Sequence, residues 1–347
     1  MYSDRKRAYK LPPLSRISQA ARREKALDDQ KQKRALKINA ARHSSLDAFA
    51  DLTLDDDEES TVVASGVAEF AKKLKPHRRN HVKSSPATNA RWADKCMYAE
   101  LLEMSCRDMD SDPLPADLHS SWVALSPVPV GKRCLAVTRD GPSFSKISLR
   151  SRLLGKPLLS YFPSTLPPNT ILDCILDAHW RYNGILHILD VLRWKGQELS
   201  ECEAGMRFWW RDTRLAELSR LPPPSSQNSA ATAYTYPYPT TLLPVPYHSA
   251  PLTLSRLLDV VVPAARNTRV VQVLNPPPLG DMDTVDTQTS HTISSDGLLL
   301  YVAEASYESG ISPLSNWVPL REENTNSSPI DTFEQLLRQQ IDSAMDI

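Results

Sequence analysis

The sequence predicts an α+β protein, in which a basic helical arm precedes a domain that is mainly antiparallel β-sheet. Residues 1–43 carry thirteen Lys and Arg against four Asp and Glu, a net charge of +9, and too few apolar residues to form a core. Residues 92–320 contain several short apolar segments with the length and composition of strands. Two segments of this domain, 221–251 and 263–292, are rich in Pro, Ser, Thr or Asp, which predicts surface loops.

The arm is expected to be helical over residues 15–42. Ser15 or Ser18 can cap its N-terminus, and Ala, Arg, Lys, Gln and Leu dominate its interior. An isolated helix is marginal in water, so we expect partial order when no partner is bound. Residues 44–91 change from acidic to Ser-rich and basic without sustained periodicity, which predicts a disordered linker.

The folded domain is expected to be mostly β with a few short helices. Tyr98–Leu102 and Leu252–Val261 resemble short helices, and a further helix is expected from Phe208 towards Leu218. The expected strands are 122–125, 133–139, 170–177, 184–193 and 297–304. The tail, residues 321–347, begins a short helix with a capping-box-like pair at Asp331 and Glu334.

Composition narrows the class of protein. Five cysteines without a Cys-x-x-Cys pair support neither a zinc site nor a disulfide framework, and they favour a reducing compartment. The N-terminus lacks the apolar core of a signal peptide, and no apolar run has membrane-spanning length. We therefore expect a soluble intracellular protein with no membrane partner.

The segment Pro127–Arg133 has the outline of a lysine motif, Lys-x-Asp-Gly-x-Arg, that opens the site of covalent nucleotidyltransferases. Gly131 and Arg133 match it, but Val128 stands at the nucleophilic lysine and Val130 at the aspartate. Valine has no lone pair with which to attack a phosphoryl group. The segment therefore predicts a nucleotide-binding scaffold without the covalent chemistry.

Three later segments resemble further motifs of the same superfamily, in the same order: Thr170–Leu176, Asp296–Leu300 and Leu314–Pro319. Cys174 and Ile175 replace a glycine and a functional glutamate, and the third segment lacks both phosphate-binding lysines. A non-catalytic protein fits these replacements best. A working RNA guanylyltransferase or ligase-like enzyme is the alternative.

Taken together, a set of fragments resembles the snurportin family of import adaptors for spliceosomal small nuclear ribonucleoproteins (snRNPs). The fragments are 129–133, 171–175, 189–196, 207–210, 296–301 and 313–317. This resemblance implies a domain with the guanylyltransferase-like nucleotide-binding fold that binds the 2,2,7-trimethylguanosine cap of small nuclear RNA. It also implies that no reaction is catalysed and that no cofactor or metal is needed.

The resemblance assigns four cap-binding residues. Trp317 matches the stacking tryptophan, because an indole face attracts a flat cationic base. Lys146 matches the lysine that faces the cap phosphates, and Ser105 matches a serine near the base. Arg107 stands where the family has its second cap tryptophan. Its guanidinium plane can stack on a base, although its charge opposes a cationic purine; Trp92 or Trp122 are alternatives for that role.

The arm resembles the family's importin-β-binding helix. The basic residues that carry this resemblance are Arg22, Arg23, Lys25, Lys31, Lys33, Arg34 and Arg42. A solvated face and an RNA-binding arm are the alternatives for this helix. The predicted protein is a monomer that shuttles between nucleus and cytoplasm and is recycled by an exportin. An import adaptor whose folded domain binds a protein cargo is a further alternative.

Overall fold

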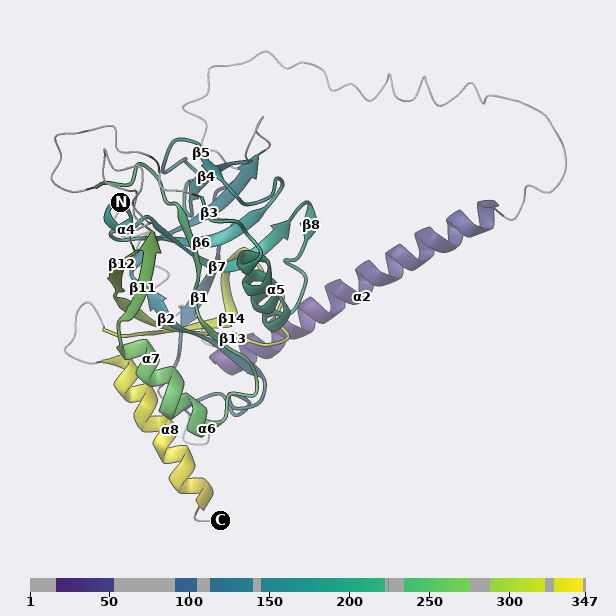
Figure 1. Cartoon of the computed structure of the whole chain (residues 1–347). Coiled ribbons are helices and arrows are strands. Elements are labelled where there is room, and N and C mark those ends of the chain that lie inside the picture. Colours follow the sequence, from purple (N-terminus) through teal and green to yellow (C-terminus); the bar gives the residue numbers. More distant parts are fainter. Residues whose placement is uncertain are drawn as a thin grey trace, which may run out of the picture. The chain divides into compact units, whose positions relative to one another are not determined.

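The computed structural model describes much of the chain, and Figure 1 shows the arrangement of its elements. The described residues are 17–52, 91–104, 113–139, 145–221, 224, 234–274, 288–321 and 328–345. The chain divides into two compact units, of which the larger comprises residues 1–27 and 89–347 and the smaller residues 28–88. Most of the expected linker 44–91 lies outside the described residues.

The first sheet has five strands in the order β1–β14–β13–β2–β10. These strands are β1 (Met97–Leu101), β2 (Trp122–Pro129), β10 (Tyr247–His248), β13 (Ser295–Val302) and β14 (Gly310–Pro319). Strand β1 runs parallel to β14, and the other neighbours are antiparallel. The first five residues of β2 are buried, as expected for an inner strand covered on both faces.

The second sheet has seven strands, six in the order β5–β4–β3–β6–β7–β8, with β9 also paired to β7. Its strands are β3 (Gly131–Arg139), β4 (Ser145–Ser151), β5 (Phe162–Ser164), β6 (Ile171–Asp177), β7 (Ile185–Trp194), β8 (Gln197–Glu198) and β9 (Thr241–Pro244). Only the β7–β9 pair is parallel in this sheet. A separate hairpin joins β11 (Arg269–Leu274) to β12 (Gln288–Ile293). The predicted α+β class is confirmed, with antiparallel and mixed sheets.

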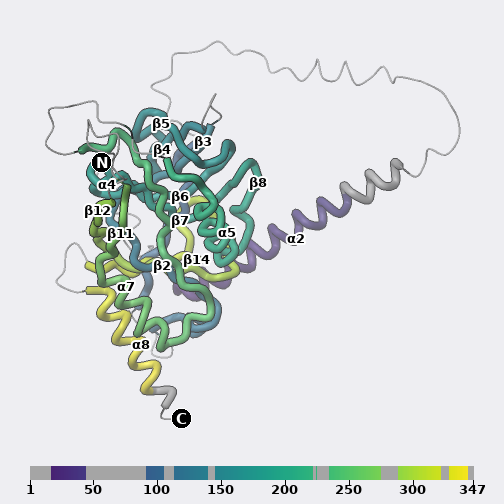
Figure 2. The backbone as a smooth tube through the Cα atoms, viewed as in Figure 1, coloured from purple at the N-terminus to yellow at the C-terminus, as the bar shows by residue number. Residues whose placement is uncertain are grey.

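Helices cover the first sheet. They are α6 (Leu254–Arg256), the π-helical turn η1 (Leu257–Val261), α7 (Val262–Arg266) and α8 (Pro329–Met345). Leu257, Val261 and Phe333 are fully buried in one apolar cluster with β2, β13 and β14. Arg266 pairs with Asp331 and Glu334 and so connects α7 to α8, which lie side by side in Figure 2. The tail helix is therefore part of the packed unit.

Helix α5 (Ala204–Ala216) places two fully buried arginines beside β7, and the short helix α4 (Trp180–Asn183) precedes that strand. Arg207 donates to both carboxylate oxygens of Asp190, at 2.9–3.2 Å, and to the carbonyl of Ala305. Arg211 donates to the carbonyls of Leu189 and Val245. Each buried guanidinium thus has acceptors, which offsets the cost of removing its charge from water.

Helix α2 (Gln19–Leu52) starts close to its expected position and extends ten residues further than expected. Its first turns, which belong to the larger unit, contact β1 and the residues after it. The Gln19 side-chain amide donates to Glu100 at 3.1 Å, and Arg22 pairs with Glu100 at 2.8 Å and with Glu103 at 3.2 Å. The Arg23 guanidinium lies over the Trp122 ring, 5.3 Å from its centroid.

The expected helix at Tyr98–Leu102 is wrong, because Tyr98–Leu101 belong to strand β1 and Leu102 follows it. Met97 and Tyr98 are buried, and the strand pairs with β14 over its whole length. Local propensity is a weak determinant, and this tertiary pairing overrides it.

The segments 221–251 and 263–292, expected as surface loops, also contain regular structure. The first contributes β9 and β10, and the second contributes most of α7 together with β11 and β12. Tyr236 and Val245 are fully buried. Short strands at a sheet edge tolerate proline, so a Pro-rich composition did not reveal them. Among the described helices, none is long and apolar enough to span a membrane.

Candidate functional site

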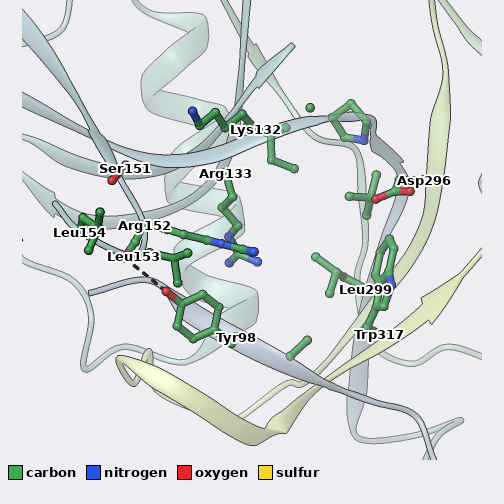
Figure 3. Close-up of a pocket in the computed structure, with 15 residues that line it drawn as sticks. Tyr98, Lys132, Arg133, Ser151, Arg152, Leu153, Leu154, Asp296, Leu299 and Trp317 are labelled. Carbon is green, nitrogen blue, oxygen red and sulfur yellow. Dashed lines mark hydrogen bonds between the residues drawn. The ribbon is translucent and has the colours of Figure 1, made fainter. Parts of the chain in front are cut away.

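A cavity of about 560 Å³ opens in the larger unit, and strands of both sheets contribute to its wall (Figure 3). Its size falls within the range of small-molecule and cofactor sites. The lining residues are Tyr98, Ala99, Val128, Pro129, Gly131, Lys132, Arg133, Ser151, Arg152, Leu153, Leu154, Ile175, Asp296, Leu299 and Trp317.

Trp317 forms one wall of this cavity. It lies on β14, half-buried, opposite Leu299 of β13 and Leu101 of β1 in the sheet register. Its backbone carbonyl accepts a hydrogen bond from the Leu102 amide at 3.0 Å. Because the strand is held on both sides, the indole has a fixed place from which to stack on a flat ligand.

The segment that resembles the lysine motif lies in the same wall. Val128 lines the cavity from β2, and Gly131 lines it from the start of β3. A Cβ at Gly131 would stand 2.3 Å from the Leu176 carbonyl oxygen, so only glycine fits where β3 meets β6. The fold therefore places Val128, which stands at the nucleophile position of the resembled motif, in the wall of the cavity.

Arg133 lines the cavity but is paired inside the protein. Its guanidinium donates to the two carboxylate oxygens of Asp173 at 3.0 and 2.8 Å. Burial lowers the Arg133 pKa, but Asp173 more than offsets this effect, so the pKa stands well above its ordinary value. The Tyr307 hydroxyl donates to the same carboxylate at 2.6 Å and accepts from the Met97 amide. This network holds β1, β3, β6 and the loop before β14 together.

Two further cations line the cavity. Lys132 is exposed at the start of β3. Arg152 follows β4, and its guanidinium lies 5.4 Å from the centroid of the Tyr98 ring. Desolvation by burial raises the Tyr98 pKa above its ordinary value. Lys132 and Arg152 offer positive charge to an anionic part of a ligand.

Of the cap-binding residues that are predicted from the sequence and described in the structure, one lies at the cavity. Trp317 lines the cavity, whereas Lys146 is exposed on β4 and is not among the lining residues. Ser105 and Arg107 lie outside the described residues. Of the alternative tryptophans, Trp122 is fully buried and donates to Asp117, and Trp92 packs beside Cys96 and Tyr98; neither lines the cavity.

The basic residues of the arm lie on α2. Arg22 and Arg23 are half-buried and make the contacts described above. Burial lowers the Arg23 pKa. Arg34 is half-buried, and the remaining four, Lys25, Lys31, Lys33 and Arg42, are exposed.

Reasoning from the sequence missed the cavity roles of Tyr98, Arg152 and Asp296. The sequence pattern predicts a helix at Tyr98, and Arg152 carries no motif signal. Asp296 was visible only as the first residue of a superfamily-like strand segment. Lys132 carries no signal of its own in the sequence, because a lone lysine is usually a solvated surface charge.

Fold and cavity together define the class: a domain of two main β-sheets with a small-molecule-sized cavity that has an aromatic wall and a cationic side. The family model described as "Snurportin1, m3G cap-binding domain" matches residues 109–236. Residues 109–236, which make up less than half of the chain, are thus similar to the m3G cap-binding domain of snurportin. Trp317 and Asp296 lie beyond the matched residues, so their place in the site comes from the geometry of the cavity.

Proposed function

We propose that this chain is a nuclear import adaptor that binds the trimethylguanosine cap of spliceosomal snRNPs and links them to importin-β. The observation that carries the cap assignment is Trp317, an indole in the wall of a nucleotide-sized cavity that also contains Lys132 and Arg152. Methylation at N7 makes guanine a flat cation, which an indole attracts by stacking and through its quadrupole. The phosphates of the cap are anions, which the two cations attract.

The residues assigned by resemblance remain part of this proposal. Lys146 would contact the phosphate chain where it leaves the cavity, because the residue is exposed on β4. Ser105 and Arg107 would contact the base. The valine at position 128 supports binding without catalysis, because it cannot form a covalent nucleotide adduct.

A tryptophan replacement tests the cap assignment. Trp317→Ala should weaken binding of a trimethylated cap dinucleotide about tenfold or more, because one base–aromatic stack contributes about 1–3 kcal/mol. Fluorescence titration with trimethylated and monomethylated analogues measures this effect. Trp209→Ala is the matched control, since Trp209 is 54% exposed on α5 and does not line the cavity. Equal affinity of Trp317→Ala and the unmodified protein would refute the assignment.

The arm is proposed to bind importin-β through its basic residues, with charge complementarity to an acidic receptor. The four exposed residues, Lys25, Lys31, Lys33 and Arg42, can be reversed to Glu together without touching the contacts of Arg22. We expect this variant to lose importin-β in a pull-down and to keep cap affinity. Deletion of residues 1–43 should give the same loss, but it also removes the contacts of Gln19 and Arg22 with Glu100. Persistence of importin-β binding in both variants would contradict the proposal.

The enzymatic alternative has its own test. Lys132 is the lysine that lines the cavity, so a working nucleotidyltransferase would have to use it or a residue outside the described parts. Incubation with labelled GTP, followed by a denaturing gel, should give no covalent adduct. A labelled band would favour the enzyme, and failure to bind any cap would favour an adaptor for a protein cargo.

The proposal includes shuttling between nucleus and cytoplasm, with return by an exportin, and a monomeric state. Sedimentation of the full chain checks the monomer. Addition of a RanGTP-loaded exportin to the cargo-free chain checks the return step. A stable dimer would contradict the monomeric state, and the absence of an exportin complex would contradict the return step.

A further inference from the structure

The charges that line the cavity have different surroundings. Lys132 and Arg152 come from the second sheet and the turn that follows β4, and Arg133 is held by Asp173. Among the fifteen lining residues, Asp296 is the one carboxylate, and Figure 3 shows it next to Trp317 and apart from Lys132. The cavity is therefore polarised, with an indole and an anion at one end and cations at the other.

The position of Asp296 is set by an irregularity in the sheet. On β13, Ser295 pairs with Pro129 and Gly297 pairs with Val128, so Asp296 is the extra residue of a bulge. Bulges redirect a side chain and are frequent next to binding sites.

The neighbouring glycine fixes the bulge against β14. Gly297 has φ of +144°, and a Cβ there would stand 2.3 Å from the Val318 carbonyl oxygen. The Asp296 carbonyl accepts from the Leu320 amide at 2.9 Å. The backbone of Asp296 is thus held to the strand that carries Trp317, only three residues beyond that tryptophan.

A serine next to Asp296 supports the turn of the bulge. The hydroxyl of Ser295 accepts from the Gly297 amide at 3.2 Å and serves that purpose. Asp296 is exposed and lines the cavity, so its carboxylate can meet a ligand beside the indole.

We propose that Asp296 is a specificity-determining residue that recognises the positive charge of the N7-methylated base stacked on Trp317. This inference rests on the proposed cap-binding function and extends it. The cap is a zwitterion, with a cationic base and anionic phosphates, and the polarised cavity orients it with the base at the Asp296–Trp317 end. Mono- and trimethylated caps carry the same base charge, so Asp296 separates N7-methylated from unmethylated guanine and not the two methylated forms from each other.

The test compares three dinucleotides with the same triphosphate: trimethylated, N7-monomethylated and unmethylated. Asp296→Asn keeps the size of the side chain and removes its charge. We expect it to weaken binding of both methylated dinucleotides about fivefold, the size expected for one solvent-facing charge pair, and to leave the unmethylated one unchanged. Asp296→Glu keeps the negative charge and should therefore retain the preference for methylated over unmethylated dinucleotides. Asp259→Asn, an exposed aspartate on η1 outside the cavity, is the matched control.

A second variant tests the other end of the cavity. Lys132→Gln should weaken all three dinucleotides by the same factor, because the phosphates are common to them. Loss of affinity in Asp296→Asn that is equal for all three dinucleotides, or no loss at all, would overturn the inference. Either of these results could be found in a protein that binds the cap and loses affinity on Trp317→Ala. In that case only the role of Asp296 is refuted, and the proposed function stands. If the unmodified protein binds no cap, the proposed function fails and this inference fails with it.

Discussion

Two groups of charged residues in the larger unit are of the same chemical types but have opposite surroundings. Arg207 and Asp190 are fully buried and bind each other, and no part of either faces the cavity. Lys132 and Asp296 are exposed and line the cavity. A buried charge must be matched within the protein, whereas an exposed one is solvated by water and can still contact a ligand. Burial and partners, and not residue type, therefore separate the charges that hold the fold from those that line the cavity.

Arg133 shares one property with each of the two groups. It lines the cavity, yet Asp173 occupies its guanidinium with two hydrogen bonds. By the same criterion we assign Arg133 to the fold, together with Tyr307, and Lys132 beside it to the ligand.

The largest expected effect on the free energy of unfolding is at the buried pair Arg207 and Asp190. Arg207→Ala leaves Asp190 as an unmatched buried charge, which should lower the free energy of unfolding by about 3–5 kcal/mol. Denaturant titration measures the loss. Arg338→Ala is the matched control, because Arg338 is exposed and pairs with Glu334 one turn away on α8, an arrangement that contributes about 0.3–0.5 kcal/mol. Equal stability of the two variants would contradict the expected difference between buried and exposed ion pairs.

An intermediate effect is expected at Tyr307. Tyr307→Phe removes the hydroxyl that donates to Asp173 and accepts from Met97, at a cost of about 1–3 kcal/mol. Burial, followed by the charge of Asp173, raises the Tyr307 pKa well above its ordinary value. The folded state therefore retains a proton that the unfolded chain loses near pH 10, so stability is full below about pH 10 and falls as the pH rises further.

The same variant checks this pH dependence. Between pH 8 and pH 11, the unmodified protein should lose more stability than Tyr307→Phe, which lacks the titrating group. Parallel stability curves for the two proteins would show that Tyr307 does not contribute to the alkaline loss.

The smallest expected effect on stability is at the cavity. Lys132→Gln should change the free energy of unfolding by no more than about 0.5 kcal/mol, since the side chain is exposed. Its cap affinity should nevertheless fall, as stated above. A large loss of stability would mean that Lys132 stabilises the fold as the buried charges do. It would contradict the distinction between buried charges and cavity-lining charges.

Most of the fold could be predicted from apolar patterns. The expected strands at 122–125, 133–139, 170–177 and 184–193 lie within or across β2, β3, β6 and β7, and the helices around Phe208 and Asp331 correspond to α5 and α8. These segments are long or regular enough for periodicity to identify them. β1 was not predicted correctly, because only its pairing with β14 makes it a strand.

The candidate site was predicted in part. Trp317 and Val128 were found through motif order, and the structure brings both to one cavity. Tyr98, Arg152 and Asp296 were not predicted, because their roles depend on which strands meet at that cavity. Lys146 was predicted, but it lies outside the lining, and its proposed contact with the phosphates awaits the binding experiments.

The sequence by itself determined the basic arm and the α+β class, and it predicted Val128 at the position of a nucleophile and Trp317 as a binding residue, since these follow from local composition and the order of motifs. The tertiary structure alone decided which charges are internal and which face the cavity. That distinction depends on burial and on partners far apart in the chain, such as Arg133 with Asp173 and Asp296 beside Trp317. No local pattern encodes such pairings, because they arise only when β3, β6, β13 and β14 come together.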